Sequence, residues 1–161
     1  MIDVLVDRYS GDVKIDKIFG FDARGFILGP PLALALNLPF YMFRKKGKMP
    51  NAVAGSTYEK EYGSDVLCIQ RGAVSPGDRV LLIDDLVATG GTLLAGVELV
   101  EQFGGVVAEC ACIVEIKFLN ARGAFEAKGH GSIPIWSLIS EEVLTVAGEL
   151  PEGYVDDGEA H

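Results

Sequence analysis

Cysteine and histidine are scarce in this chain. Its 161 residues include three cysteines and two histidines. Cys68, Cys110 and Cys112 are odd in number and show no pairing pattern, which excludes the disulfide scaffold of small secreted proteins. His130 lies in a glycine-rich segment and His161 ends the sequence, so a metal site built from His and Cys is not expected. We expect three buried, reduced thiols.

Basic charge and long apolar runs are also lacking. The formal net charge is −9, with 14 Lys and Arg against 23 Asp and Glu. Nucleic acids and anionic membranes attract a basic face, so neither partner is expected. No stretch approaches the length of a transmembrane helix, and residues 1–8 lack the basic start and apolar core of a secretory signal. A cytoplasmic location is the expectation.

Two familiar nucleotide-binding motifs are absent. The sequence has no loop ending in Gly-Lys-Ser/Thr and no G-x-G-x-x-G fingerprint, which excludes Walker-type and dinucleotide-binding loops. A hydrophobic content of 49% over 161 residues is enough for one domain with a core of its own.

The most informative segment that is present covers residues 80–92, Val-Leu-Leu-Ile-Asp-Asp-Leu-Val-Ala-Thr-Gly-Gly-Thr. Residues 80–83 suit a strand buried on both faces, and Asp84 and Asp85 then fall at its carboxyl end, where α/β sheets bind ligands. The loop that follows offers backbone N–H groups and two hydroxyls at the start of a helical pattern, as a phosphate cradle does. Its residues are Ala88, Thr89, Gly90, Gly91 and Thr92. The segment therefore predicts a ribose-5-phosphate site.

Two alternatives concern the charged residues. One alternative takes the acidic pair as a helix cap and the glycines as a plain turn, but adjacent acids after a buried strand are costly without a ligand role. The basic run at residues 44–48 is, in isolation, typical of a solvated loop. In an acidic protein with a phosphate loop elsewhere, the same run favours contact with an anionic substrate.

Strand and helix patterns alternate along the chain. We expect strands at residues 17–21, 39–43 and 106–114, and a helix at 25–36 that Asn37 and Pro39 terminate. This alternation predicts an α/β fold with a mostly parallel sheet.

Three further segments have recognisable patterns. Residues 57–70 read as an extended hairpin or flap with its turn at 63–65, and residues 75–78 read as a turn before the acidic strand. Apolar residues at 2, 5, 6 and 9 have helical spacing. Residues 151–161 are acidic and turn-rich, so we expect a disordered tail.

The acidic motif resembles the phosphoribosyl pyrophosphate (PRPP) motif of type I phosphoribosyltransferases. Three other segments make the chain similar to the adenine phosphoribosyltransferases of that family, in order and approximate spacing. They are residues 21–26 (Phe-Asp-Ala-Arg-Gly-Phe), 44–50 (Arg-Lys-Lys-Gly-Lys-Met-Pro) and 58–63 (Tyr-Glu-Lys-Glu-Tyr-Gly). The resemblance extends from about residue 15 to 138.

The resemblance implies a type I phosphoribosyltransferase fold, a twisted and mostly parallel sheet flanked by helices with a flexible flap. It also implies Mg²⁺-dependent transfer of the 5-phosphoribosyl group from PRPP to adenine, giving AMP and diphosphate in purine salvage. The Mg²⁺ would be carried by the PRPP diphosphate, with no direct protein ligand, and the enzyme would be a homodimer.

The same resemblance leaves alternatives open. Nothing in the sequence matches the family's upstream hood over the purine, so residues 1–150 are expected to form a single domain with a shortened N-terminal part. A truncated product, a PRPP-binding or non-catalytic homologue, and a phosphoribosyltransferase for another purine base remain as alternatives.

Roles carry over residue by residue. Asp84 and Asp85 would hold the ribose hydroxyls and stabilise the cationic transition state, the loop described above would hold the 5-phosphate, and Arg24 and Lys45 would hold the diphosphate. Lys48 is a weaker candidate for the diphosphate than Arg24 and Lys45.

Proton transfer and base binding involve another three residues. Glu61 matches the flap acid of the family, with Tyr62 beside it, and enclosure by the flap would raise its pKa. Ile116 would lie on the purine, although an aliphatic residue there also suits an ordinary core.

Overall fold

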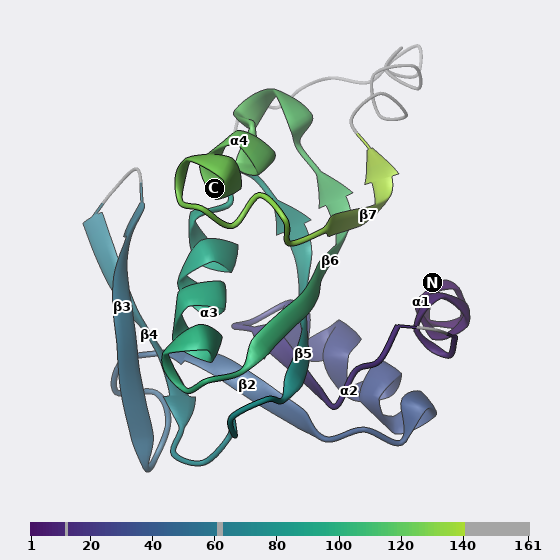
Figure 1. Ribbon diagram of the computed structural model, residues 1–161, viewed down its shortest axis with the longest axis horizontal. Coiled ribbons are helices and arrows are strands. Elements are labelled where there is room, and N and C mark those ends of the chain that lie inside the picture. The colour runs from purple at the N-terminus through teal and green to yellow at the C-terminus, as the bar shows by residue number, and fades with distance from the viewer. Residues whose placement is uncertain (12, 61–62, 141–161) are drawn as a thin grey trace, which may run out of the picture.

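The computed structural model describes residues 1–11, 13–60 and 63–140. In these residues the chain forms one sheet of seven strands with helices on both faces (Figure 1). The strands are β1 (Lys17–Phe21), β2 (Phe40–Lys45), β3 (Ala52–Lys60), β4 (Gly63–Gln70), β5 (Arg79–Val87), β6 (Val106–Glu115) and β7 (Ile135–Ser140). The helices are α1 (Ile2–Tyr9), α2 (Gly25–Leu36), α3 (Gly91–Gln102) and α4 (Ala121–Ala127), with a 3-10 turn η1 (Lys117–Leu119).

The sheet is mostly parallel. Its strand order is β3-β4-β2-β1-β5-β6-β7, and all pairs from β2 to β7 in this order are parallel. Among the described strands β4 alone has the reversed direction, so both of its pairings, with β2 and with β3, are antiparallel. Alternation of strands and helices along the chain produces this arrangement. The predicted α/β fold, with a mostly parallel sheet flanked by helices, is confirmed.

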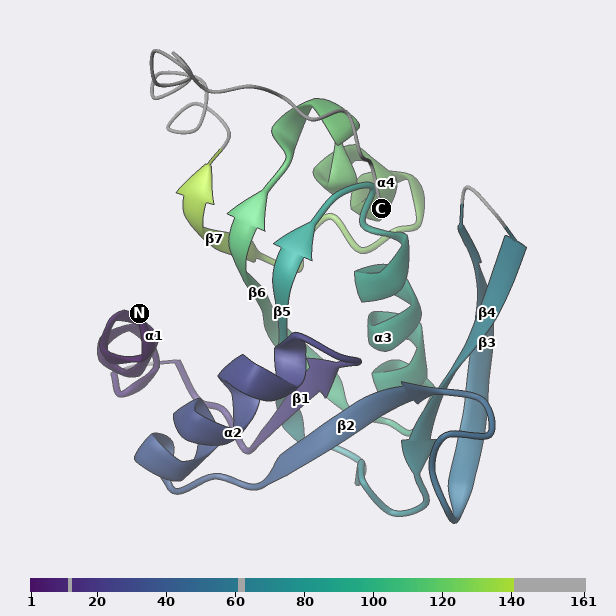
Figure 2. The same ribbon diagram turned by 180° about the vertical axis from the view of Figure 1, so that it is seen from behind.

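Helix α3 covers one face of the sheet, and α1 and α2 cover the other (Figure 1, and from behind in Figure 2). Successive residues of the central strands enter different cores. Phe19 and Leu82 join the core beneath α3, while Ile18 and Leu81 join the core beneath α2, and all four side chains are fully buried. Each contributes about 1.5–3 kcal/mol by leaving water. An uninterrupted apolar run is therefore required in β5.

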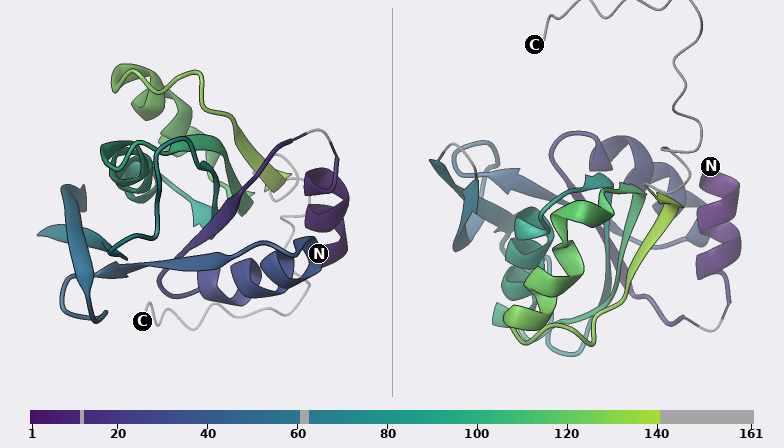
Figure 3. Two further views of the ribbon diagram at one scale, coloured as in Figure 1. Left: turned by 60° about the horizontal axis from the view of Figure 1, so that its bottom comes forward. Right: turned by 90° about the horizontal axis from the view of Figure 1, so that it is seen from above.

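The β3–β4 hairpin and α1 lie at opposite sides of the molecule (Figure 3). The hairpin packs against α3. Helix α1 packs against α2 and buries Leu5 and Tyr9, so the helix predicted from residues 2, 5, 6 and 9 is confirmed.

The predicted ends of α2 are confirmed. The helix runs from Gly25 to Leu36, and Asn37 follows in the left-handed conformation at φ 54°. The backbone N–H groups of Asn37 and Leu38 donate to the carbonyls of Leu34 and Ala33 in the last turn, and Pro39 then prevents further helix.

One sequence prediction about β-structure is wrong. The turn of the hairpin was expected at residues 63–65, but Gly63 pairs with Lys60 and Ser64 pairs with Glu59, so these residues belong to β4. Polar residues in a paired strand were mistaken for a turn. The acidic pair was expected at the carboxyl end of its strand, and it lies in the last part of β5, which continues to Val87 because β6 pairs with it that far.

Several predictions lie outside the described residues or are not tested. Glu61 and Tyr62 fall in the gap at 61–62, and the tail at 151–161 falls in the segment 141–161. The single domain over 1–150 stays a prediction. No helix of the described chain is long and apolar enough to cross a membrane.

Candidate functional site

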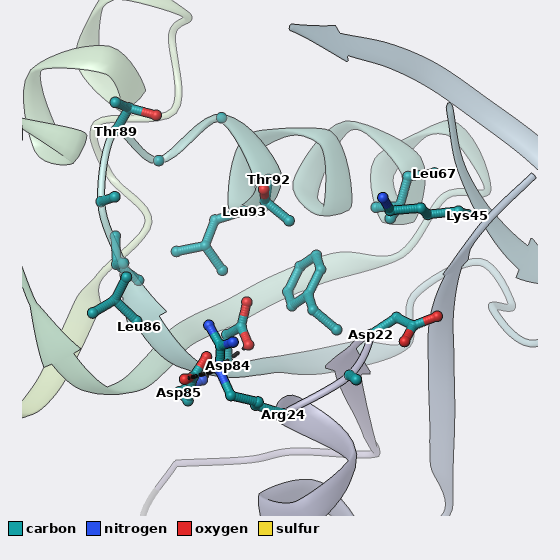
Figure 4. A pocket seen from close by; sticks show the side chains of 16 residues that line it. Asp22, Arg24, Lys45, Leu67, Asp84, Asp85, Leu86, Thr89, Thr92 and Leu93 are labelled. Carbon is teal, nitrogen blue, oxygen red and sulfur yellow. Dashed lines mark hydrogen bonds and ion pairs between the residues drawn. The ribbon is translucent and has the colours of Figure 1, made fainter. Parts of the chain in front are cut away.

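A cavity of about 270 Å³ opens at the carboxyl ends of β1 and β5 (Figure 4). It is lined by residues 21–24 at the end of β1, by residues 84–93 from the end of β5 to the start of α3, and by Lys45 and Leu67. The chain leaves β1 into α2 on one face of the sheet and leaves β5 into α3 on the other. The cavity therefore lies at a topological switch point, where open α/β sheets bind their ligands.

The acidic diad projects where the central strands separate. Pairing of β5 with β1 ends at Ile83, opposite Gly20, while pairing with β6 continues to Val87. Asp84 and Asp85 thus lose a neighbour on the β1 side and face the cavity. The Asp85 N–H donates to Asp84 Oδ1 at 2.9 Å, which fixes the first carboxylate.

The two carboxylates have different environments. Burial, together with the charge of Asp85, raises the pKa of Asp84 to about 7. The hydrogen bond from the Asp85 N–H and the more distant charge of Arg24 act in the opposite direction on this pKa. Asp85 instead forms an ion pair with Arg24 Nε (Figure 4). This bond and the charge of Asp85 raise the pKa of the exposed Arg24 guanidinium. The site therefore holds one partly protonated acid beside one paired acid.

The loop between β5 and α3 has the geometry of an anion cradle. Gly90 has φ 83°, in the left-handed region that favours glycine, and α3 begins at Gly91 with no side-chain cap on its first turn. Uncapped N–H groups at the start of a helix attract a phosphate. Ala88, Thr89, Gly90, Gly91 and Thr92 all line the cavity.

The segment after β1 brings a second set of charges to the cavity. The Asp22–Ala23 peptide bond is cis. Arg44 Nε on β2 donates to Asp22 Oδ2 at 3.0 Å, and its guanidinium lies 6.0 Å from the Phe26 ring centre. Lys45, the next residue of β2, lines the cavity.

The predicted site residues do not all meet at this cavity. Arg24, Lys45, Asp84 and Asp85 line it together with the 88–92 loop. Lys48 is exposed and does not line it.

Ile116 is half-buried just beyond β6 and is not a lining residue. Its N–H donates to the Val87 carbonyl at 2.9 Å, which fixes it next to the lining strand. Leu86 supplies an apolar side chain on the cavity wall, 37% exposed, that sequence reasoning missed. The sequence signal for Leu86 is its place directly after the acidic pair.

Sequence reasoning also missed two buried acids of β6. Glu109 is 3% exposed and pairs with Arg8 at 2.6 Å, and Glu115 is 2% exposed and pairs with Arg122 at 2.8 Å. A Glu in an apolar strand pattern is a signal for such a pair, because a buried carboxylate requires a partner.

Comparisons with known proteins identify the family. The phosphoribosyl transferase domain family model matches residues 3–134. The chain is 52% identical over 119 residues to the adenine phosphoribosyltransferase of Streptococcus thermophilus, covering 74% of this chain and 69% of that protein. It is 47% identical over 142 residues to the Neisseria meningitidis serogroup C enzyme of the same name, covering 88% and 73%.

Solved structures agree with the sequence relatives. The adenine phosphoribosyltransferase of Leishmania tarentolae superposes with a TM-score of 0.83 at 40% identity, covering 92% of this chain and 74% of that one. The Trypanosoma brucei enzyme, solved with AMP, pyrophosphate and ribose-5-phosphate, gives 0.83 at 36% identity, covering 99% and 71%. The chain belongs to the type I phosphoribosyltransferase family, within its adenine phosphoribosyltransferase branch.

Proposed function

We propose that the chain transfers the 5-phosphoribosyl group of PRPP to adenine, producing AMP and diphosphate for purine salvage. One observation carries this proposal: the Asp84-Asp85 pair and an uncapped, glycine-containing helix start line the same cavity. That combination suits a ribose with a phosphate on its 5-carbon. The names of the relatives supply the base, and the Trypanosoma brucei structure holds AMP, pyrophosphate and ribose-5-phosphate.

The 88–92 loop would hold the 5-phosphate. It includes the uncapped start of α3, whose N–H groups are available as donors, and the Thr89 and Thr92 hydroxyls add further donors. Because Gly90 is already in the left-handed conformation, the loop needs little rearrangement on binding.

The acidic pair would hold the ribose hydroxyls and stabilise the transition state. Loss of diphosphate from C1 develops positive charge on the ribose ring, and fixed carboxylates nearby favour that charge. Burial raises the pKa of Asp84 to about 7, which favours its protonated form. Hydrogen bonds from ribose hydroxyls would favour its charged form, so ribose binding and ionisation of Asp84 assist each other.

The diphosphate would lie between Arg24 and Lys45, on the wall of the cavity opposite the phosphate loop. Arg24 now pairs with Asp85, and its guanidinium can turn to the diphosphate, because its side chain is 69% exposed. This exchange would release Asp85 to the ribose. Lys48 is the weaker candidate, since it lies outside the cavity lining.

The donor set fits a magnesium ion that travels with the substrate. In the described part of the chain no three His, Cys, Asp or Glu side chains come together as a metal site. The carboxylates that line the cavity are Asp22, Asp84 and Asp85, so an oxygen-seeking ion would take most of its ligands from diphosphate and water. When bound, Mg²⁺ would neutralise the charge of the leaving diphosphate.

For binding of the base and for proton transfer, we propose the residues that the sequence indicated. Ile116 would present an apolar surface for adenine, supported by its position beside Val87. Glu61 and Tyr62 would act from the connection between β3 and β4, with Glu61 as the acid or base near the purine.

A second copy of the chain is the proposed partner. Helix α2 is apolar all round, and Ile27 and Leu34 are 71% and 85% exposed on the side away from the sheet. A helix of that composition is normally covered on every side, so a homodimer through α2 is proposed. A cytoplasmic location is proposed because Cys68, Cys110 and Cys112 are buried free thiols, which suits a reducing compartment.

The test is an assay of the purified chain with PRPP, Mg²⁺ and radiolabelled adenine, hypoxanthine or guanine. The proposal expects AMP from adenine, little product from the other bases, and a loss of about 100-fold in kcat/KM for Asp85→Asn. PRPP binding without any nucleotide product would reject catalysis in favour of a binding-only homologue. A preference for hypoxanthine or guanine would reassign the base.

A further inference from the structure

The junction of β6, β7 and α4 contains an ion pair that the mechanism above does not use. Glu115 is 2% exposed. The Arg122 guanidinium donates from Nε to Glu115 Oε1 and from Nη2 to Oε2, each at 2.8 Å. Arg122 Nη2 also donates to the Ile135 carbonyl at 2.7 Å, and the Ser137 hydroxyl donates to Glu115 Oε2 at 3.4 Å. One guanidinium thus joins α4 to the ends of two strands.

The Glu115–Arg122 ion pair is connected to the phosphate loop in two ways, and the first is through the backbone. Val87 on β5 is the register partner of Glu115 on β6, and the next N–H along, that of Ile116, donates to the Val87 carbonyl at 2.9 Å. Val87 lines the cavity and directly precedes the 88–92 loop. The position of Glu115 therefore fixes the residue from which the loop departs.

The second contact runs through α4. Ala121, next to Arg122, is 2% exposed and packs against the turn at Gly90. A Cβ built on Gly90 would lie 3.0 Å from the Ala121 Cβ and 3.2 Å from its Cα. Asn120, at φ 53°, fixes the start of α4, where its Oδ1 accepts from the Gly123 N–H at 3.1 Å. Helix α4 thus forms a backing for the loop.

We infer that Arg122 is a positioning residue for the 5-phosphate of PRPP: its two-point bond to Glu115 holds Val87 and Ala121 against the 88–92 loop. The inference rests on the proposed function, which assigns the phosphate to that loop. Arg122 does not line the cavity, so its effect passes through the backing. A loop held in its bound geometry before the ligand arrives binds more tightly, because less order must be imposed on binding.

The same strand supplies a matched control. Glu109 is 3% exposed and pairs with Arg8 through Nη2 at 2.6 Å and Nε at 3.1 Å. Arg8 belongs to α1, at the side of the molecule away from the phosphate loop. Arg8→Gln and Arg122→Gln each leave one buried carboxylate of β6 without its arginine, but only the second lies behind the loop.

The experiment titrates ribose 5-phosphate, and PRPP with Mg²⁺, into the full chain and these variants, together with steady-state kinetics. Arg122→Gln is expected to weaken ribose 5-phosphate binding and raise the KM for PRPP about tenfold, with the KM for adenine nearly unchanged. Arg8→Gln is expected to lower the melting temperature similarly and to leave both constants at wild-type values. Equal affinities in the two variants would overturn the inference.

Further variants keep the test decisive. Arg122→Lys retains the charge but not the two parallel hydrogen bonds, so it should lose most of the affinity; wild-type binding there would assign the effect to charge and overturn the positioning role. Should Arg122→Gln fail to fold, the double variant Arg122→Met with Glu115→Leu takes its place, because it leaves no unpaired buried charge. This double variant is expected to show the same tenfold loss of affinity, and wild-type binding would again overturn the inference. A wild-type chain that binds no PRPP would instead reject the proposed function, and the inference with it.

Discussion

Asp84→Asn is expected to stabilise the ligand-free protein although it damages the proposed site. Burial, reinforced by the Asp85 charge, raises the pKa of Asp84 from its ordinary 3.8 to about 7. The folded state therefore holds a proton that the unfolded chain has already released between those values. Because the unfolded state binds fewer protons than the folded state between about pH 4 and about pH 7, the free energy of unfolding falls as the pH rises through this range. The asparagine has no proton to lose, and its Oδ1 can still accept from the Asp85 N–H, now at 2.9 Å.

The size of the effect follows from the shift in pKa. At about 1.4 kcal/mol per pKa unit, a rise from 3.8 to about 7 sets a ceiling of about 4 kcal/mol. Asp84 is partly exposed to the cavity, and solvent screening reduces the expected gain to about 1–2 kcal/mol. This corresponds to a rise of about 4 °C in melting temperature at pH 8.

The assay is urea unfolding of the wild type and Asp84→Asn from pH 4 to pH 8. The difference in unfolding free energy should be small at pH 4 and reach its maximum above pH 7. Asp78→Asn is the control, with an expected effect of opposite sign. Partial burial of the Asp78 carboxylate disfavours its charge, but the Lys17 ammonium at 2.7 Å and the Ser75 N–H outweigh burial and lower the pKa of Asp78. That variant should lose stability above pH 4. A constant difference across the pH range for Asp84→Asn would show that the pKa of Asp84 is not raised by folding.

Three other substitutions test the loop, the diphosphate contact and the dimer. Gly90→Ala forces a methyl group into a left-handed turn at φ 83°, against Ala121, and should cost about 1–3 kcal/mol in urea unfolding and weaken ribose 5-phosphate binding; unchanged stability would contradict the packing described. Arg24→Gln should raise the KM for PRPP about tenfold with an unchanged melting temperature, and an unchanged KM would remove Arg24 from the site. Leu34→Asp should convert a dimer to a monomer in sedimentation velocity, while Val106→Asp, at an exposed apolar residue remote from α2, should not; a dimer that survives Leu34→Asp would place the interface elsewhere.

Contiguous patterns explain most of what could be predicted from the sequence. The buried run at 80–83, the diad and the 88–92 loop are consecutive, so one stretch of chain held both the strand and the site. Helix α2 was bounded correctly because Asn37 and Pro39 end it by backbone geometry, which does not depend on the rest of the fold. The strand β1 was short and apolar, and its bounds were also correct.

Features that depend on distant partners could not be predicted. Arg24 and Asp85 are 61 positions apart, and only the parallel pairing of β1 with β5 brings them together. Pairing with β6 likewise extends β5 past the diad to Val87. The sequence predicted no element in the segment 117–140, which forms η1, α4 and β7, and the Glu115–Arg122 ion pair links α4 to the sheet.

The decisive measurement is a crystal structure of the chain with AMP. We expect the 5-phosphate on the N–H groups of the 88–92 loop, the ribose hydroxyls on Asp84 and Asp85, and the adenine against the apolar surface of Ile116. A nucleotide bound with its phosphate elsewhere, and with the 88–92 loop in contact only with solvent, would contradict it.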